Sequence, residues 1–228
     1  MRTLVALLVA AALAGCSSTP SPHPLTQDQA DLLAVIRFKN YDHGLVSFRG
    51  RVPSAAGTLE LAGRIDYRRG IGYGTLRTEG GSGYGSTGLL QWNGRELAFL
   101  AGATDAAGSP PAGQWQLRPV QAPGGELDTA LALLLGLGSD RPDNAQLLRQ
   151  SNARWLRPEA VGGTPVDVFE GPGAAAGRHD SGSRLRYWVA AGGDLCRVEA
   201  RIGAAESDAS FDLVPGATPF TTLPQLSK

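Results

Sequence analysis

Two long blocks of this sequence alternate apolar and polar residues with a period of two, and this pattern limits the possible folds more than any other feature. The first block contains the stretches LVSFRGRV and TLELAGRIDY, and a second block of the same kind follows residue 153. Such alternation is typical of antiparallel strands with one buried and one solvated face. The apolar positions of the first two stretches are Val46, Phe48, Val52, Leu59, Leu61, Ile65 and Tyr67.

Helical patterns interrupt the strands in only a few places. Residues 26–42 have apolar side chains at helical spacing, and Thr26 with Gln29 three positions later has the form of a capping box. The leucine-rich stretch 126–137 predicts a second helix, and 142–150 predicts a short third one beginning at a proline. Strands and helices do not alternate, so the order predicts an α+β fold with a curved, partly closed antiparallel sheet and helices on one side.

The N-terminus has the features of a secretory leader. Arg2 precedes an apolar run from Leu4 to Leu13, which is shorter than the roughly 20 residues of a membrane-spanning helix. Cys16 follows Leu-Ala-Gly directly, and this arrangement resembles the lipobox of bacterial lipoproteins. The resemblance implies that residues 1–15 are removed, that Cys16 is diacylated, and that the protein is anchored at the extracytoplasmic side of the cell membrane. The alternative is an ordinary signal peptide with an incidental cysteine.

The leader is followed by a linker and one domain. Residues 16–25 are rich in serine and proline, and such a chain can hold the domain on the order of 25 Å from the bilayer. Residues 26–228 are expected to form a single domain. With Cys16 acylated, Cys196 has no partner for a disulfide within the chain, so the fold must depend on its core.

Composition and motifs argue against several classes of function. The formal net charge is zero, from 21 basic and 21 acidic residues, and no basic block indicates nucleic-acid binding. Gly83-x-Gly85-x-x-Gly88 matches a dinucleotide fingerprint as a string, but a strand and hairpin follow it rather than a helix. His179-Asp180-Ser181 lies in a glycine- and alanine-rich stretch and cannot form a catalytic triad by sequence adjacency. We therefore expect no cofactor, no metal site and no enzymatic activity.

The pattern of elements resembles the LolA-like lipoprotein fold, and in particular the LppX/LprG type of lipid-binding lipoprotein. The resemblance covers about residues 26–215 and depends on VSFRGRV with TLELAGRIDYRRG, on ELDTALALLLGLG, and on VDVFEG with RLRYWVAAGGDLCRVEARI. In the last segment, Trp188 precedes a Gly-Asp hairpin and Arg197-Val198-Glu199 follows it. The resemblance implies an unclosed antiparallel half-barrel with helices over its concave face, and a space between them for acyl chains.

We therefore expect lipid or an acylated molecule to bind between the sheet and the leucine-rich helix. Each buried CH₂ contributes about 0.8 kcal/mol, so a C16 chain could gain on the order of 10 kcal/mol before association costs. The expected partners are the membrane, through the acyl anchor, the lipid ligand, and an envelope transporter that exchanges it. The alternatives are a filled-core scaffold that recruits an envelope protein and an envelope enzyme. The expected ligand-binding residues are Val46, Phe48, Leu59, Leu61, Ile65, Trp92, Phe99, Leu131, Leu134 and Leu135.

Overall fold

The structure, a computed structural model, describes residues 20–55, 57–80, 86–121, 124–173, 185–203 and 207–226. The leader, Cys16, Gly83, Gly85 and the His179–Ser181 stretch lie outside these ranges, so the predictions made for them stay predictions.

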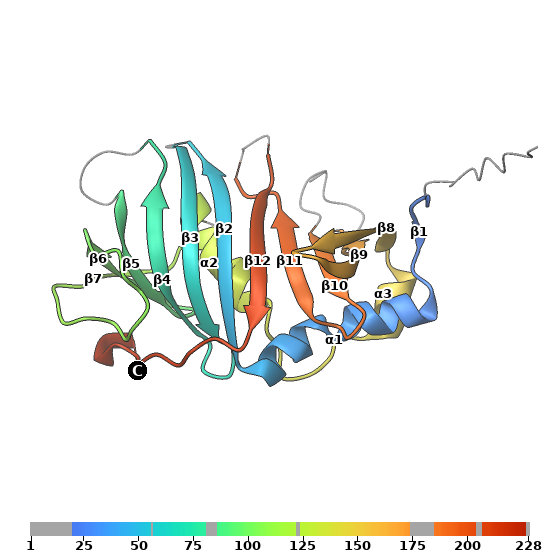
Figure 1. The fold of residues 1–228 in the computed structure, drawn as a ribbon, viewed down its shortest axis with the longest axis horizontal. Helices are drawn as coiled ribbons and strands as arrows, with labels where there is room; N and C mark the ends of the chain where they lie inside the picture. Colours follow the sequence, from blue (N-terminus) through green and yellow to red (C-terminus); the bar gives the residue numbers. More distant parts are fainter. Residues whose placement is uncertain are drawn as a thin grey trace, which may run out of the picture.

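Within these ranges, one antiparallel sheet of twelve strands and three α-helices make up the fold (Figure 1). The strand order is β1-β8-β9-β10-β11-β12-β2-β3-β4-β5-β6-β7, and β1 and β7 form separate edges. This confirms the expected α+β fold with an unclosed antiparallel sheet. The helices are α1 (Gln27–His43), α2 (Glu126–Gly136) and α3 (Ala145–Gln150), with a 3₁₀ turn at Pro224–Leu226. The strands are β1 (His23–Pro24), β2 (Leu45–Ser54), β3 (Gly57–Asp66), β4 (Ile71–Thr78), β5 (Thr87–Trp92), β6 (Glu96–Ala101), β7 (Gln116–Pro119), β8 (Arg154–Val161), β9 (Thr164–Glu170), β10 (Arg186–Ala190), β11 (Leu195–Ala200) and β12 (Ala209–Pro215).

The concave face of the sheet holds the main hydrophobic core. Helix α2 lies across this face behind β2 and β3, and α1 runs along the ends of the neighbouring strands (Figure 1). The Trp92 indole Nε1 donates a hydrogen bond to the Leu131 carbonyl oxygen at 3.2 Å, so α2 contacts the sheet directly. The centre of the concave face is therefore filled with side chains.

Glycines on the concave face make room for aromatic rings of the next strand. A Cβ at Gly50 would lie 2.1 Å from the Phe211 ring, and a Cβ at Gly72 would lie 2.2 Å from the Trp92 ring. Both distances are far inside van der Waals contact, so these rings lie flat against the strands. β4 pairs in continuous register with both neighbours, so Gly72 and Gly74 form no β-bulge.

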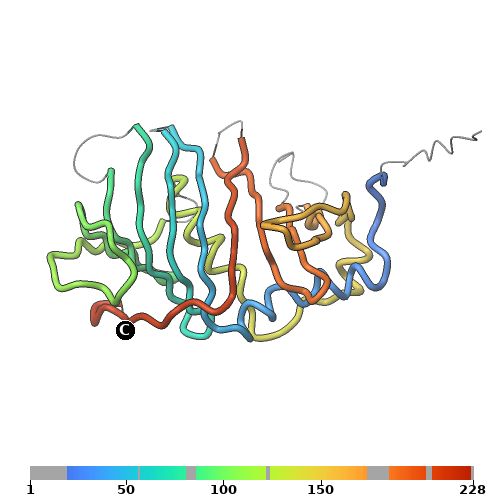
Figure 2. The backbone as a smooth tube through the Cα atoms, viewed as in Figure 1, coloured from blue at the N-terminus to red at the C-terminus, as the bar shows by residue number. Residues whose placement is uncertain are grey.

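The opposite, convex face is covered at one end by the C-terminal segment. This segment leaves β12 and runs along the sheet to β5 and β6 (Figure 2). Arg64, which is only 7% exposed, donates hydrogen bonds to the carbonyl oxygens of Thr218, Ala106 and Gly108 and lies over the ring of Phe220. The Gln91 side chain, fully buried, bonds to the backbone at 221 and 223. A buried guanidinium and a buried amide thus fix a segment that has no periodic sequence pattern.

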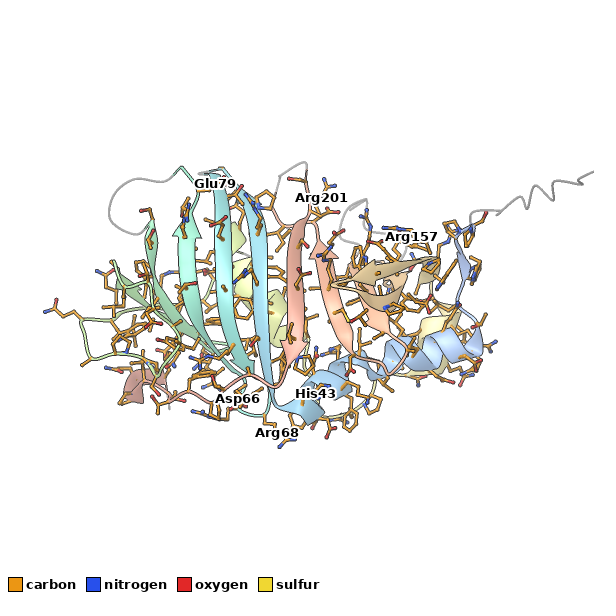
Figure 3. All side chains as sticks on the ribbon, viewed as in Figure 1. His43, Asp66, Arg68, Glu79, Arg157 and Arg201 are labelled. Carbon is orange, nitrogen blue, oxygen red and sulfur yellow. The ribbon has the colours of Figure 1, made fainter. Side chains whose placement is uncertain are left out.

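Charged side chains gather at the strand ends and on the convex face. Glu79, Arg201 and Arg157 lie toward one end of the strands, and Asp66, His43 and Arg68 lie toward the other (Figure 3). Exposed ion pairs such as those of Glu79 with Arg51 and of Arg157 with Glu159 contribute little to stability because water screens them.

The N-terminal boundary of the domain differs from the expected one. Thr26 caps α1 as predicted, since its side chain accepts from the Gln29 amide at 3.3 Å and Gln29 Oε1 accepts from the Thr26 amide at 3.0 Å. However, His23 stacks on Trp155 with ring centroids 4.8 Å apart, and Leu25 is 6% exposed in the core. The segment 23–25, expected in the linker, therefore packs on the domain and leaves a shorter tether.

Candidate ligand-binding site

A cavity of about 590 Å³ opens between the three helices and the start of β10. Its volume lies within the roughly 300–1,000 Å³ that is typical of ligand pockets. Its walls are mainly aliphatic. The lining residues are Leu33, Ile36, Arg37, Leu133, Gly136, Leu137, Asp143, Asn144, Leu147, Leu148, Ser151, Pro172, Leu185 and Tyr187.

The cavity lies beside the end of α2, whose C-terminal carbonyl groups are bonded to α1. Helix α2 stops at Gly136, which has no side chain to fill the gap, and a Cβ built there would meet nothing within 4 Å. The chain then crosses to α3, which begins after Asn144; the Asn144 side chain accepts a hydrogen bond from the Leu147 amide at 3.1 Å. This cap places the start of α3 after residue 144 rather than at the proline at 142, where the sequence suggested it.

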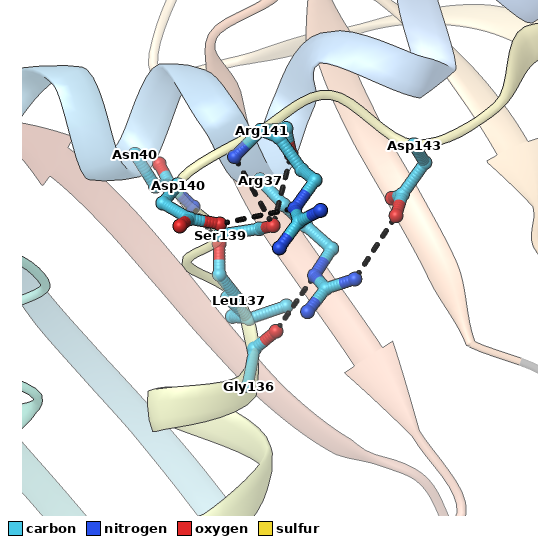
Figure 4. A network of polar contacts seen from close by, with 8 residues as sticks. All are labelled: Arg37, Asn40, Gly136, Leu137, Ser139, Asp140, Arg141 and Asp143. Atoms are coloured by element: carbon cyan, nitrogen blue, oxygen red, sulfur yellow. Dashed lines mark hydrogen bonds and ion pairs between the residues drawn. The ribbon is translucent and has the colours of Figure 1, made fainter.

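A polar network fixes the helices around the cavity (Figure 4). Arg37 donates from Nε to the Gly136 carbonyl oxygen at 2.9 Å and from Nη1 to Asp143 Oδ1 at 3.0 Å. The buried Asn40 side chain donates to the Leu137 carbonyl oxygen at 2.9 Å. Carbonyls at the end of a helix have no partner within it, so α1 supplies the donors that α2 lacks. The network holds the cavity open and adds no net charge, since Arg37 and Asp143 neutralise each other.

Tyr187 adds a hydroxyl group to the otherwise aliphatic wall. Burial raises the pKa of Tyr187 to about 12, with a smaller lowering effect from Arg37 and a raising effect from Asp143. The hydroxyl therefore stays neutral at physiological pH. The cavity is suited to a hydrocarbon chain whose polar end lies near Arg37, Asp143 and Tyr187.

A second, smaller pocket of about 340 Å³ lies at the other end of α2. Arg118 borders it and forms two hydrogen bonds to the buried Asp128 carboxylate, at 2.7 and 2.5 Å. The lining residues are Leu76, Leu90, Leu97, Phe99, Gln116, Leu117, Arg118 and Leu127. Helix α2 thus fills the middle of the concave face and leaves a pocket at each end.

Most of the expected ligand-binding residues lie in the packed core. Phe99 lines the second pocket, and Leu135 packs against the core while partly exposed. The expected residues in the core line neither of these two pockets, and contact between them and a ligand stays a prediction. The expected residues that are buried in the core are Val46, Phe48, Leu59, Leu61, Ile65, Trp92, Leu131 and Leu134.

The residues that line the larger cavity were not expected from the sequence as ligand contacts. Leu33 and Ile36 have the apolar spacing of a core-facing helix, which does not distinguish a core contact from a cavity wall. Leu148 and Tyr187 come from separate segments that only the fold brings together. The sequence contains no local signal for the cavity, because a glycine such as Gly136 marks the end of a helix whether or not a cavity lies beside it.

The other titratable groups of the described residues have structural contacts. In the described ranges, no group of three or more His, Cys, Asp and Glu residues is placed to hold a metal ion. Burial, with a contribution from Asp194, raises the pKa of the Cys196 thiol, so it is protonated at neutral pH. His43 Nε2 lies 2.7 Å from Asp194 Oδ1 and ties α1 to the turn before β11. Among the helices in these ranges, none has the length and apolar character needed to cross a bilayer.

Comparison with known proteins gives similarities to solved structures but no match among sequences. No family model and no curated protein sequence matches this chain. Among solved structures, the chain is similar to an outer membrane lipoprotein-sorting protein domain from Vibrio parahaemolyticus, with 12% identity and a TM-score of 0.33. The match covers 81% of this chain and 90% of that one. At these values the similarity carries no information about the ligand or activity of this chain.

Proposed function

We propose that this protein is an envelope lipoprotein, anchored through Cys16, that binds a hydrocarbon chain in the cavity between α1, α2 and α3. The observation that carries the proposal is the 590 Å³ cavity with its mainly aliphatic wall and internally neutralised charges. The lipobox-like leader supports an anchor at the extracytoplasmic side of the membrane. Exchange of the bound chain with an envelope transporter belongs to the same proposal.

The size of the cavity sets the expected strength of binding. It has the volume of about 20 water molecules at roughly 30 Å³ each. A chain that buries about ten CH₂ groups gains roughly 8 kcal/mol from transfer out of water. Association costs at least about 4 kcal/mol of this gain, so binding is reversible, as a carrier requires.

The test is a variant that fills the cavity without disturbing the fold. Gly136→Leu adds a side chain where a Cβ meets no atom within 4 Å, and leucine is also a better helix former than glycine. Gly94→Leu is the matched control, because Gly94 is exposed in the turn between β5 and β6 and likewise has open space around it. Binding of a fluorescent C16 fatty acid is titrated for the wild type and both variants, and thermal unfolding is measured in parallel.

We expect Gly136→Leu to weaken binding of the fatty acid at least about tenfold, which corresponds to 1.4 kcal/mol, without lowering the melting temperature. Gly94→Leu should bind like the wild type. Equal affinity in all three proteins would place the ligand elsewhere.

The filled-core scaffold remains the second candidate, and the direct contact between Trp92 and Leu131 favours it. Native mass spectrometry of protein extracted gently from membranes separates the two. Co-purified lipid in the wild type that is lost in Gly136→Leu supports the carrier. A mass without lipid, together with no uptake of the fatty acid, supports the scaffold.

A further inference from the structure

The N-terminal segment leaves the domain at one end of the sheet. β1 pairs with β8, and Arg154 donates from Nη2 to the Pro22 carbonyl oxygen at 3.2 Å. Because His23 also stacks on Trp155, the chain is fixed to the domain up to Pro22. Cys16 precedes Pro22 by six positions, and a fully extended chain spans at most about 3.6 Å per residue, so the anchor lies within roughly 20 Å of Pro22.

The larger cavity borders the same end of the molecule. Helix α3 ends at Gln150, its cap Ser151 lines the cavity, and β8 begins at Arg154. Figure 1 shows β1, α3 and the start of α1 together at this end, far from β7. The rim of the cavity and the exit of the anchored segment are therefore neighbours.

An exposed leucine marks this rim. In the described part of the chain, the large hydrophobic side chains that are exposed are Leu117 (40%), Leu147 (64%) and Val214 (62%). Leu117 is on the edge strand β7 and Val214 is on β12, both away from α3. Leu147 is the one of the three that lines the larger cavity, and it belongs to α3, which lies at the same end of the molecule as β1.

We propose that α3 rests on the surface of the membrane that carries the Cys16 anchor, with Leu147 inserted among the lipids and the cavity open toward the bilayer. This inference depends on the proposed function, since it requires the anchor. A single inserted leucine is a weak contact for a free protein, but a short tether gives a high effective concentration at the surface. The cavity could then exchange a hydrocarbon chain with the bilayer without passing it through water.

The charges near α3 favour an apolar rather than an electrostatic contact. Arg37 is paired with Asp143, and Arg141 with Asp140. The exposed Arg149 adds one positive charge at the last turn of the helix. Docking through Leu147 is therefore expected to change little with salt concentration, in contrast to attraction by a basic patch.

The experiment uses the lipidated mature protein, reconstituted in vesicles of phosphatidylethanolamine and phosphatidylglycerol. All variants carry Cys196→Ser, so that a single introduced cysteine can be labelled with the environment-sensitive dye NBD. Leu147→Cys reports on the proposed contact, and Leu117→Cys and Val214→Cys are matched controls at the other exposed hydrophobic positions. Emission is recorded with and without vesicles, and with spin-labelled lipids that quench the dye inside the bilayer.

We expect a several-fold rise and a blue shift of emission at position 147, with quenching by the spin-labelled lipids, and neither change at 117 or 214. Equal signals at the three positions would overturn the proposal, as would insertion at 117 or 214 instead. A blue-shifted signal at 147 in the absence of vesicles would also overturn it, because it would indicate contact with a second copy or with the protein's own acyl chains.

The docking proposal and the carrier proposal fail separately. Gly136→Leu in the Leu147→Cys protein fills the cavity and should leave the bilayer signal at 147 unchanged. If Gly136→Leu abolishes fatty-acid binding while position 147 gives no bilayer signal in either protein, the carrier proposal is retained and the docking surface is rejected. A bilayer signal at 147 without any fatty-acid binding would reject the carrier.

Discussion

Removal of Arg118 should destabilise the protein more than removal of its partner Asp128. The Asp128 side chain is 4% exposed, whereas the Arg118 side chain is 45% exposed. Among the described residues, Arg118→Ala therefore leaves a buried carboxylate that keeps the Gln121 amide as a donor at 2.8 Å. Asp128→Ala leaves a guanidinium that water can reach.

The asymmetry can be expressed in free energy. Loss of one partner of a buried pair costs about 3–5 kcal/mol when the remaining charge is buried. The remaining amide and the partial exposure of the pair reduce this to about 2–4 kcal/mol for Arg118→Ala. Asp128→Ala loses hydrogen bonds without burying a charge, at about 1–2 kcal/mol. For a chain of this length the expected falls in melting temperature are about 4–16 °C for Arg118→Ala and about 2–8 °C for Asp128→Ala.

The loss of stability in Arg118→Ala should also depend on pH. Burial tends to raise the pKa of Asp128, but hydrogen bonds from Arg118 and the Gln121 amide outweigh it and hold the pKa below its usual value. In the wild type, the ionised Asp128 stabilises the folded protein fully above the unfolded pKa of about 3.9, and this stabilisation is lost as the pH falls through the lower pKa of the folded state. In Arg118→Ala the carboxyl can protonate more easily, so the difference between variant and wild type should shrink toward about pH 4.

Urea unfolding followed by tryptophan fluorescence, at neutral pH and near pH 4, measures both effects. Arg157→Ala is the control, because its ion pair with Glu159 at 2.7 Å is half exposed and contributes at most about 1 kcal/mol. Equal losses for Arg118→Ala and Asp128→Ala, or a difference that does not change with pH, would refute the argument.

Two further predictions concern the core and the cavity wall. Gly72→Ala places a Cβ 2.2 Å from the Trp92 ring and should lower the free energy of unfolding by about 1–3 kcal/mol. Gly94→Ala is the control, because the space around Gly94 is open and the change should be near neutral. Equal melting temperatures of the two variants would contradict the close approach of the ring. Burial raises the pKa of Tyr187 to about 12, so the folded state favours the neutral phenol. The stabilisation from burying this neutral phenol should be present below about pH 10 and lost as the pH rises toward 12. Ultraviolet titration should show a late tyrosinate step that Tyr187→Phe removes, and an unchanged curve in that variant would contradict it.

Local signals in the sequence predicted the elements of the fold well. The capping pair of Thr26 and Gln29 predicted a helix over 26–42, and the structure has it at Gln27–His43. Period-two alternation predicted the strands and their buried faces, because it depends only on which side of a strand faces the core. The turn at Gly192-Gly193-Asp194 likewise separates β10 from β11 as expected.

Tertiary packing decided what the sequence did not predict. The segment 216–226 has no periodic pattern, and its position depends on the buried Arg64 and Gln91 side chains, which are distant in sequence. The cavity depends on where α2 ends relative to α1 and α3, which no local pattern specifies. Leu33 and Leu131 lie in similar helical patterns and both belong to the core, yet Leu33 also lines the cavity and Leu131 does not.

The pairing of β2 with β12 joins the two strand blocks at the middle of the sheet, although these strands come from nearly opposite ends of the chain. Synthesis delivers β12 last, so the sheet stays in two separate halves until the final strands emerge, and contacts between such distant segments form slowly. During that interval the free edge of β2 is the segment that a holding chaperone would have to shield from aggregation.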